Sequence, residues 1–159
     1  VDIVSDFLEG KRIVNYLVEI GGELRSNGTN PDSKLWLVGI DKPTEDSNFQ
    51  QDFQIILGLE NSSLATSGNY RKFKEIDGVK YSHTISTETG FFAKNRMLSA
   101  TVIHPSCMFS DAYATTFMTM GVKTSKEFAQ NHKELKVYFV YSDKNGDWKT
   151  YSSENLITD

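Results

Sequence analysis

Short hydrophobic stretches, separated by turn residues, recur along most of the chain. Strands are expected at 15–20, 23–26, 36–40, 53–59, 63–67, 71–76, 79–83, 98–104, 137–141 and 148–151. Asn27-Gly28, Asp77-Gly78 and the segment 143–146 are typical turn sequences between such strands. The pattern therefore predicts a sheet-rich protein whose strands are mostly antiparallel, with an exposed polar loop at 42–51.

Three other segments have the spacing of helices. Hydrophobic residues recur every three or four positions over 1–8, and Gly10 is expected to end that helix. A second helix is predicted from about Cys107 to Gly121, with Phe117 among its buried positions, and a third is expected to begin at Ser125. Together these elements predict an α+β fold, with few helices packed on a mostly antiparallel sheet in a single domain, 1–159.

The composition narrows the class of protein. The 159 residues are 38% hydrophobic, 24% charged and 12% aromatic, which is typical of one globular unit rich in sheet. A net charge of -4 without a basic stripe argues against a nucleic-acid partner. The single cysteine, Cys107, is predicted to be a small buried residue rather than a nucleophile. No run of about 18 apolar residues is present, so no membrane span is predicted.

The second predicted helix contains a candidate metal site. Asp111 and Thr115 are four positions apart, so their side chains are expected on one face of the helix. A carboxylate and a hydroxyl suit magnesium, which takes one or two carboxylates and completes its shell with water and substrate phosphates. Alternatively, Asp111 caps the helix and Thr115 is an ordinary interior threonine.

Three further segments carry polar groups that suit a nucleotide. Gly21-Gly22, flanked by Glu19 and Glu23, would let a ligand approach the main chain, or else forms a bulge or tight turn. The segment 65–68 offers hydroxyls and amides to a phosphate, or is a simple turn. His83 ends a predicted strand and is either a general acid or base or a structural histidine. The two other histidines, His104 and His132, are interpreted as structural or surface residues.

Four motifs in order resemble the FAD:protein FMN transferase family, the ApbE-like proteins. The matching segments are NYLVEIGGEL at 15–24, ATSGNY at 65–70, YSH at 81–83 and DAYAT at 111–115. Their separations also fit, so the resemblance covers about residues 1–145. Val1-Asp2 resembles the end of the family's Lys-Gly-aromatic-Ala-Val-Asp stretch. The resemblance thus implies that the chain, which does not begin with methionine, is the C-terminal part of an ApbE-like, T-fold-like protein whose N-terminal part is absent.

The resemblance also implies an activity. Members of the family use magnesium to cleave the FAD pyrophosphate and transfer FMN to a threonine or serine of a target protein. In that interpretation Asp111 and Thr115 hold Mg²⁺, and His83 takes the proton of the incoming hydroxyl. The residues that would line the flavin nucleotide site are Gly21, Gly22, Glu23, Thr66, Ser67 and His83. The implied partners are FAD and an acceptor such as an FMN-bearing subunit of a redox-driven ion pump.

Departures from the family pattern leave other functions open. After the histidine the family usually has Asp-Pro-basic-Thr-Gly-Tyr-Pro, whereas Ser86, Glu88 and Phe92 replace the aspartate, the basic residue and the last proline. A looser turn is expected there. The alternatives are an FAD pyrophosphatase that releases FMN and AMP, and a non-catalytic flavin-binding member. The resemblance implies a periplasmic or cell-envelope location, with membrane attachment only through an N-terminal lipid anchor that this chain lacks.

Overall fold

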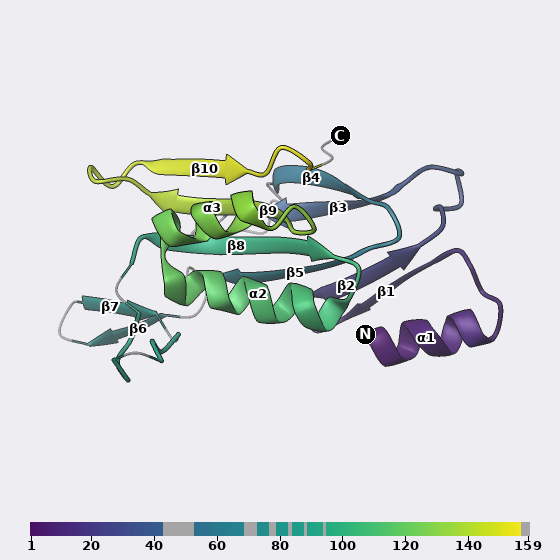
Figure 1. Cartoon of the computed structure of the whole chain (residues 1–159), viewed down its shortest axis with the longest axis horizontal. Helices are drawn as coiled ribbons and strands as arrows, with labels where there is room; N and C mark the ends of the chain where they lie inside the picture. The colour runs from purple at the N-terminus through teal and green to yellow at the C-terminus, as the bar shows by residue number, and fades with distance from the viewer. Residues whose placement is uncertain are drawn as a thin grey trace.

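An antiparallel sheet of six strands, in the order β1-β2-β5-β8-β9-β10, forms the body of the protein (Figure 1). The computed structural model describes residues 1–42, 53–68, 73–76, 79–82, 84–87, 89–93 and 95–156. The strands of this sheet are β1 (Tyr16–Ile20), β2 (Glu23–Asn27), β5 (Ser63–Gly68), β8 (Met97–His104), β9 (Lys136–Ser142) and β10 (Trp148–Ser152). All six begin and end within one residue of the sequence prediction, and the α+β class is confirmed.

Two hairpins lie outside the main sheet. Strands β3 (Trp36–Asp41) and β4 (Phe53–Leu59) pair with each other, as do β6 (Phe73–Ile76) and β7 (Val79–Ser82). Residues 43–51 of the loop predicted at 42–51, and the Asp77-Gly78 turn, lie outside the described residues; these segments would connect the paired strands.

Three helices complete the described structure: α1 (Asp2–Gly10), α2 (Cys107–Met120) and α3 (Val122–Asn131). Helices α2 and α3 lie across one face of the main sheet, while α1 lies beside the β1 end (Figure 1). The prediction that the third helix begins at Ser125 was wrong. Gly121, with φ of 76°, ends α2, and the chain enters α3 at the next residue. Within the described residues no helix is long and apolar enough to span a bilayer.

Each face of the main sheet has its own hydrophobic core, because successive side chains of a strand point to opposite faces. On the helix face, residues of α2, α3 and the central strands pack together: Met97, Ala100, Val102, Ala114, Phe117, Met118, Ala129, Leu135, Val137 and Phe139. On the other face, the β3–β4 hairpin packs on the sheet through Ile40, Leu57, Leu59, Leu64 and Ile103. The protein therefore has three layers, in the order helices α2 and α3, main sheet, and β3–β4 hairpin.

The middle of the sheet has an open strand edge. Strand β5 pairs with β8 over its whole length, up to Gly68 opposite Ser99. On its other side it pairs with β2 only at Leu24–Leu64 and Arg25–Ser63, because the β1–β2 hairpin turns just before Glu23. Residues 65–68 of β5 thus have no partner from β2 along this edge within the described structure, and the edge faces a pocket.

Candidate functional site

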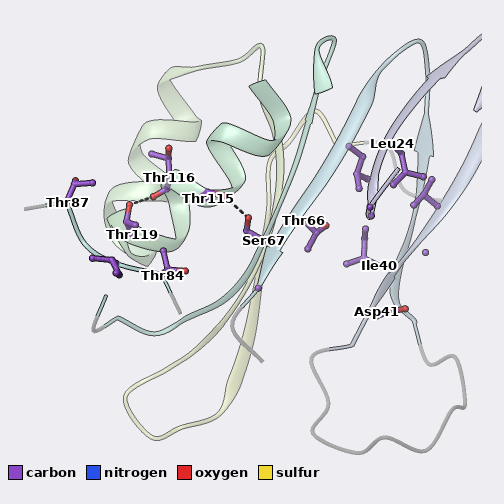
Figure 2. A pocket seen from close by; sticks show the side chains of 17 residues that line it. Leu24, Ile40, Asp41, Thr66, Ser67, Thr84, Thr87, Thr115, Thr116 and Thr119 are labelled. Atoms are coloured by element: carbon purple, nitrogen blue, oxygen red, sulfur yellow. Dashed lines mark hydrogen bonds between the residues drawn. The ribbon is translucent and has the colours of Figure 1, made fainter. Parts of the chain in front are cut away.

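A pocket of about 900 Å³ lies along the open edge of β5 (Figure 2). It reaches both faces of the sheet at this point. The lining residues come from the β1–β2 turn, β2, β3, β5, α2 and the segment after β7: Gly21, Gly22, Leu24, Val38, Gly39, Ile40, Asp41, Leu64, Thr66, Ser67, Gly68, Thr84, Ile85, Thr87, Thr115, Thr116 and Thr119. This volume is near the upper end of ordinary small-molecule sites and accommodates a ligand of nucleotide size.

The pocket has two chemically different walls. Figure 2 shows threonine side chains of α2 and of the segment 84–87 on one side, with Ser67 beside them. Leu24, Ile40 and their aliphatic neighbours Val38 and Leu64 lie on the side of the β3–β4 hairpin. Hydroxyl groups hydrogen-bond phosphate or hydroxylated groups, whereas aliphatic side chains pack against a ring. The pocket therefore suits an elongated ligand that is polar in one half and apolar in the other.

The described walls contain no positively charged side chain. Asp41 is the one ionisable residue among the described lining residues, and no Lys, Arg or His is found there. A phosphate bound against this wall would receive hydrogen bonds but no neutralising charge from these side chains. A bound cation would supply that charge.

The first predicted nucleotide segment forms the two-residue turn of the β1–β2 hairpin. Gly21 and Gly22 have φ of 71° and 95°, and a pair of positive φ angles is the requirement of the tight turn that matches the twist of a hairpin. The Gly22 amide donates to Glu19 Oε1 at 2.8 Å. Of the two interpretations of this segment, the structure shows the tight turn. Both glycines also line the pocket.

Glu23 occupies a different position from its neighbours. Side chains alternate along β2, so Glu23 projects to the face opposite Leu24, and it is not among the lining residues. Burial is the main cause of the raised pKa of the Cys107 thiol, and the negative charge of Glu23 adds to it, so Glu23 lies near the start of α2. Its proposed role at the nucleotide stays a prediction.

Both hydroxyls of the second segment, Thr66 and Ser67, line the pocket but point to opposite faces of β5. Thr66 Oγ1 lies 2.8 Å from Thr101 Oγ1 on β8, within hydrogen-bonding distance. Ser67 Oγ lies 3.0 Å from Thr115 Oγ1 on α2. The two predicted segments, which are 48 residues apart at this contact, therefore meet in one site.

Asp111 and Thr115 lie on α2 as predicted, one turn apart. Thr115 lines the pocket, whereas Asp111 is exposed and is not among the lining residues. Asp111, like Asp2 and Glu23, helps to raise the pKa of Cys107, although burial is the largest cause, and that pKa rises to about 11. Asp111 thus lies closer to the start of α2 than Thr115 does, outside the set of residues that line the pocket. Cys107 is buried and protonated at neutral pH, in agreement with a structural role.

The start of α2 is capped from a distant part of the chain. Ser106 precedes the helix but makes no side-chain capping bond to it. Instead, the Asp2 carboxylate accepts hydrogen bonds from the Cys107 and Met108 amides, both at 3.0 Å, and from Ser106 Oγ at 2.9 Å. Arg25 Nη1 donates to the same carboxylate at 3.0 Å. This link ties α1, β2 and α2 together and was not predicted, because its partners are about a hundred residues apart.

These hydrogen bonds lower the pKa of Asp2. Partial burial by itself would raise the pKa, but the bonds from the Cys107 and Met108 amides, Ser106 and Arg25 outweigh it. The pKa falls from its ordinary value of 3.8 to about 2. Asp2 is therefore ionised throughout the physiological range, where its charge also complements the positive end of the α2 dipole.

Asp2→Asn should lower the free energy of unfolding at neutral pH by about 1–2 kcal/mol, allowing for solvent screening of a side chain that is 25% exposed. Since the folded protein holds the pKa of Asp2 below its ordinary value, the contribution is complete above about pH 4 and is lost as the pH falls toward 2. Urea unfolding of both proteins at pH 6 and pH 3 measures this. An equal difference at both values would contradict it, and exposed Asp6→Asn, at the same arginine, is the control.

His83 and Glu88 lie outside the described residues, so their predicted roles stay predictions. The described parts of the segment after His83 form a closed turn. Ser86 donates its amide proton to Phe91 O at 2.8 Å and accepts from the Gly90 amide at 2.8 Å. These bonds use main-chain atoms, so the turn does not depend on a particular side chain at position 86. Thr84 and Thr87 of this segment line the pocket.

The other two histidines have structural contacts, as interpreted from the sequence. His104 Nδ1 accepts from the Ser106 amide at 3.0 Å, just before α2. The His132 ring stacks on Phe128, and its Nδ1 lies 2.9 Å from Glu134 Oε1. Neither residue is among those that line the pocket.

These features define an α+β protein with a site of nucleotide size at an open strand edge. Residues 1–139 match the model of the ApbE family, and the chain belongs to that family. The FAD:protein FMN transferase of Vibrio cholerae is 40% identical over 156 residues, covering 98% of this chain and 45% of that protein. The corresponding protein of Haemophilus influenzae is 35% identical over 146 residues, covering 92% and 41%.

A solved structure agrees with this assignment. The flavin transferase ApbE from Vibrio cholerae superposes with a TM-score of 0.81 at 39% identity, over 97% of this chain and 47% of that chain. The resemblance found in the sequence motifs is therefore confirmed. The chain spans about half the length of the relatives that it matches.

Proposed function

We propose that this chain supplies one part of the FAD site of a magnesium-dependent enzyme that transfers FMN to a threonine or serine of a target protein. The observation that carries the proposal is the two-sided pocket, with hydroxyl groups on one wall and aliphatic side chains on the other. FAD has the same division, since its pyrophosphate is polar and its fused ring system is largely apolar. The relatives from Vibrio cholerae and Haemophilus influenzae are FAD:protein FMN transferases, which supports the same assignment.

The proposed reaction is a displacement at phosphorus. The acceptor oxygen forms a bond to the phosphorus of the FMN half, and the bond from that phosphorus to the bridging oxygen breaks, so that AMP leaves. His83 takes the proton of the acceptor hydroxyl. Thr66 and Ser67 hold the pyrophosphate oxygens by hydrogen bonds, while the aliphatic wall packs against the ring.

The side chains present fit magnesium as the required cation. The described pocket wall offers phosphates no positive charge, which supports a role for a bound cation, and its donors are hard oxygen atoms. No cluster of three or more His, Cys, Asp or Glu side chains is found in the described part of the chain. That is expected for Mg²⁺, which commonly uses one carboxylate with water and substrate phosphates, and Asp111 and Thr115 would hold it. When bound, it would neutralise the charge that develops on the phosphates.

The test uses the full-length protein, FAD and a purified FMN-bearing subunit of a redox-driven ion pump. Reactions with Mg²⁺, with EDTA and without the acceptor are compared for AMP release and for flavin fluorescence bound covalently to the acceptor. Covalent labelling with equal AMP release, lost in EDTA, is the expected result. AMP release without labelling would indicate a pyrophosphatase, and FAD binding without AMP release would indicate a non-catalytic member.

His83→Ala should separate binding from reaction. The pocket walls that contact FAD remain, so FAD affinity should change little, whereas transfer should fall roughly 100- to 10,000-fold because the acceptor hydroxyl loses its base. Equilibrium FAD binding and the rate of acceptor labelling measure the two effects. Partial recovery of the rate at higher pH, where the hydroxyl ionises more readily, would support the assigned role, and an unchanged rate would contradict it.

The cell-envelope location belongs to the same proposal and rests on the family resemblance. Fractionation of cells that produce the full-length protein checks it, and recovery in the cytoplasmic fraction would contradict it.

A further inference from the structure

The hydroxyl contact between Ser67 and Thr115 joins the two halves of the polar wall. Ser67 and Gly68 are the last two residues of β5, and Thr115 lies in the middle of α2. Their Oγ atoms are 3.0 Å apart, and both residues line the pocket (Figure 2). Either oxygen is able to donate, so the direction of this hydrogen bond depends on what else Thr115 binds.

The neighbouring threonines of α2 behave differently. Thr116 Oγ1 donates to Ala112 O at 2.8 Å, and Thr119 Oγ1 donates to Thr116 O at 2.7 Å. Both protons are thus used on the helix's own carbonyls, which is the ordinary arrangement for a helical threonine. Thr115 instead directs its hydroxyl away from the helix, and its hydrogen bond within the described structure is to Ser67.

We infer that Ser67 is a positioning residue for Thr115: it accepts the hydroxyl proton of Thr115 and so turns the lone pairs of Thr115 toward the bound cation. A neutral hydroxyl that coordinates a cation through oxygen has to donate its proton elsewhere. Ser67 Oγ, at 3.0 Å, is the acceptor that the structure provides. Groups that orient metal ligands in this way commonly change metal affinity when they are replaced.

The orientation also leaves Ser67 with a proton of its own. As the acceptor from Thr115, Ser67 donates that proton to a phosphate oxygen in the same pocket. The inference rests on the proposed function, because it takes Thr115 as a ligand of the cation. The inference gives Ser67 a role in cation binding that is present before any nucleotide binds. Cation binding without nucleotide therefore distinguishes this role from simple contact between Ser67 and a phosphate.

Mn²⁺ binding to the full-length protein, followed by electron paramagnetic resonance without nucleotide, tests the inference. Mn²⁺ is a suitable probe because it accepts the same oxygen ligands as Mg²⁺. Ser67→Ala should weaken Mn²⁺ binding roughly tenfold, with a melting temperature close to that of the unaltered protein. Ser67→Thr, which keeps the hydroxyl, should restore the affinity to within about threefold.

A matched control removes another hydroxyl from the same wall. Thr116→Val removes a hydroxyl with little change in side-chain shape. The hydroxyl of Thr116 donates to Ala112 O, so its removal should not change Mn²⁺ affinity. Unchanged Mn²⁺ affinity in Ser67→Ala, while Thr115→Val and Asp111→Asn both lose binding, would overturn the inference alone. If Mn²⁺ affinity is unchanged in either Thr115→Val or Asp111→Asn, the proposed metal site is overturned, and the inference with it.

Discussion

Replacing Asp111 with asparagine should reduce the magnesium-dependent turnover of the full-length protein on the order of 100- to 1000-fold. Asparagine keeps the size of the side chain and removes the charge that the proposed cation requires. The side chain of Asp111 is exposed on α2 and makes no hydrogen bond or ion pair with the described residues. The free energy of unfolding should therefore change by less than about 0.5 kcal/mol.

Turnover at several Mg²⁺ concentrations and urea unfolding measure the two effects of Asp111→Asn. Glu127→Gln is the matched control, because Glu127 is also an exposed helical acid, lies 3.9 Å from Lys123 Nζ and is not among the residues that line the pocket. This control should retain its turnover. If Asp111→Asn melts early and keeps its magnesium-dependent turnover, Asp111 is part of the scaffold and not a metal ligand.

Replacing Phe117 with alanine should lower the free energy of unfolding by about 3–5 kcal/mol. The ring is fully buried at 0% exposure, between the helices and the main sheet. Its centroid lies 5.1 Å from that of Phe139 on β9 and 5.9 Å from that of Phe128 on α3. Removal of the ring leaves a cavity that the rigid sheet does not fill by relaxation, so both the lost burial and the cavity contribute.

Urea unfolding, read by circular dichroism, measures the effect of Phe117→Ala. The matched control is Phe91→Ala, because Phe91 is 74% exposed and its replacement should change stability by less than about 0.5 kcal/mol. A loss below about 1 kcal/mol for Phe117→Ala would show that α2 is not anchored by this ring. Since α2 also carries Thr115, the same variant should weaken Mn²⁺ binding at temperatures near its melting point.

Much of the local structure was predictable because it depends on short-range rules. Alternation of hydrophobic residues located the strands, and the turn sequence at 143–146 located the β9–β10 hairpin. The start of α3 was mispredicted at Ser125, since Ser125 resembles an N-terminal cap. In the structure its side chain is buried and donates to Phe117 O at 3.3 Å, inside the helix pair.

Long-range contacts were not predictable, because no local pattern records them. Asp2 caps α2 through the Cys107 amide across a separation of 105 residues, and Arg25 donates to the same carboxylate from β2. The aliphatic wall of the pocket, from Val38 to Ile40 on β3, also had no signal in the sequence beyond that of an ordinary strand.

The sequence by itself determined the fold class, the positions of the strands and the family, because periodicity, turn chemistry and ordered motifs are properties of short segments. It also placed Asp111 and Thr115 one turn apart on a helix. Only the tertiary structure decided which of the candidate residues share a site. The β2–β5 pairing stops at Leu24–Leu64, which leaves an open edge of β5, and α2 lies close enough for Thr115 to meet Ser67 at 3.0 Å. Strand register and helix packing, which depend on the whole core, produced that contact.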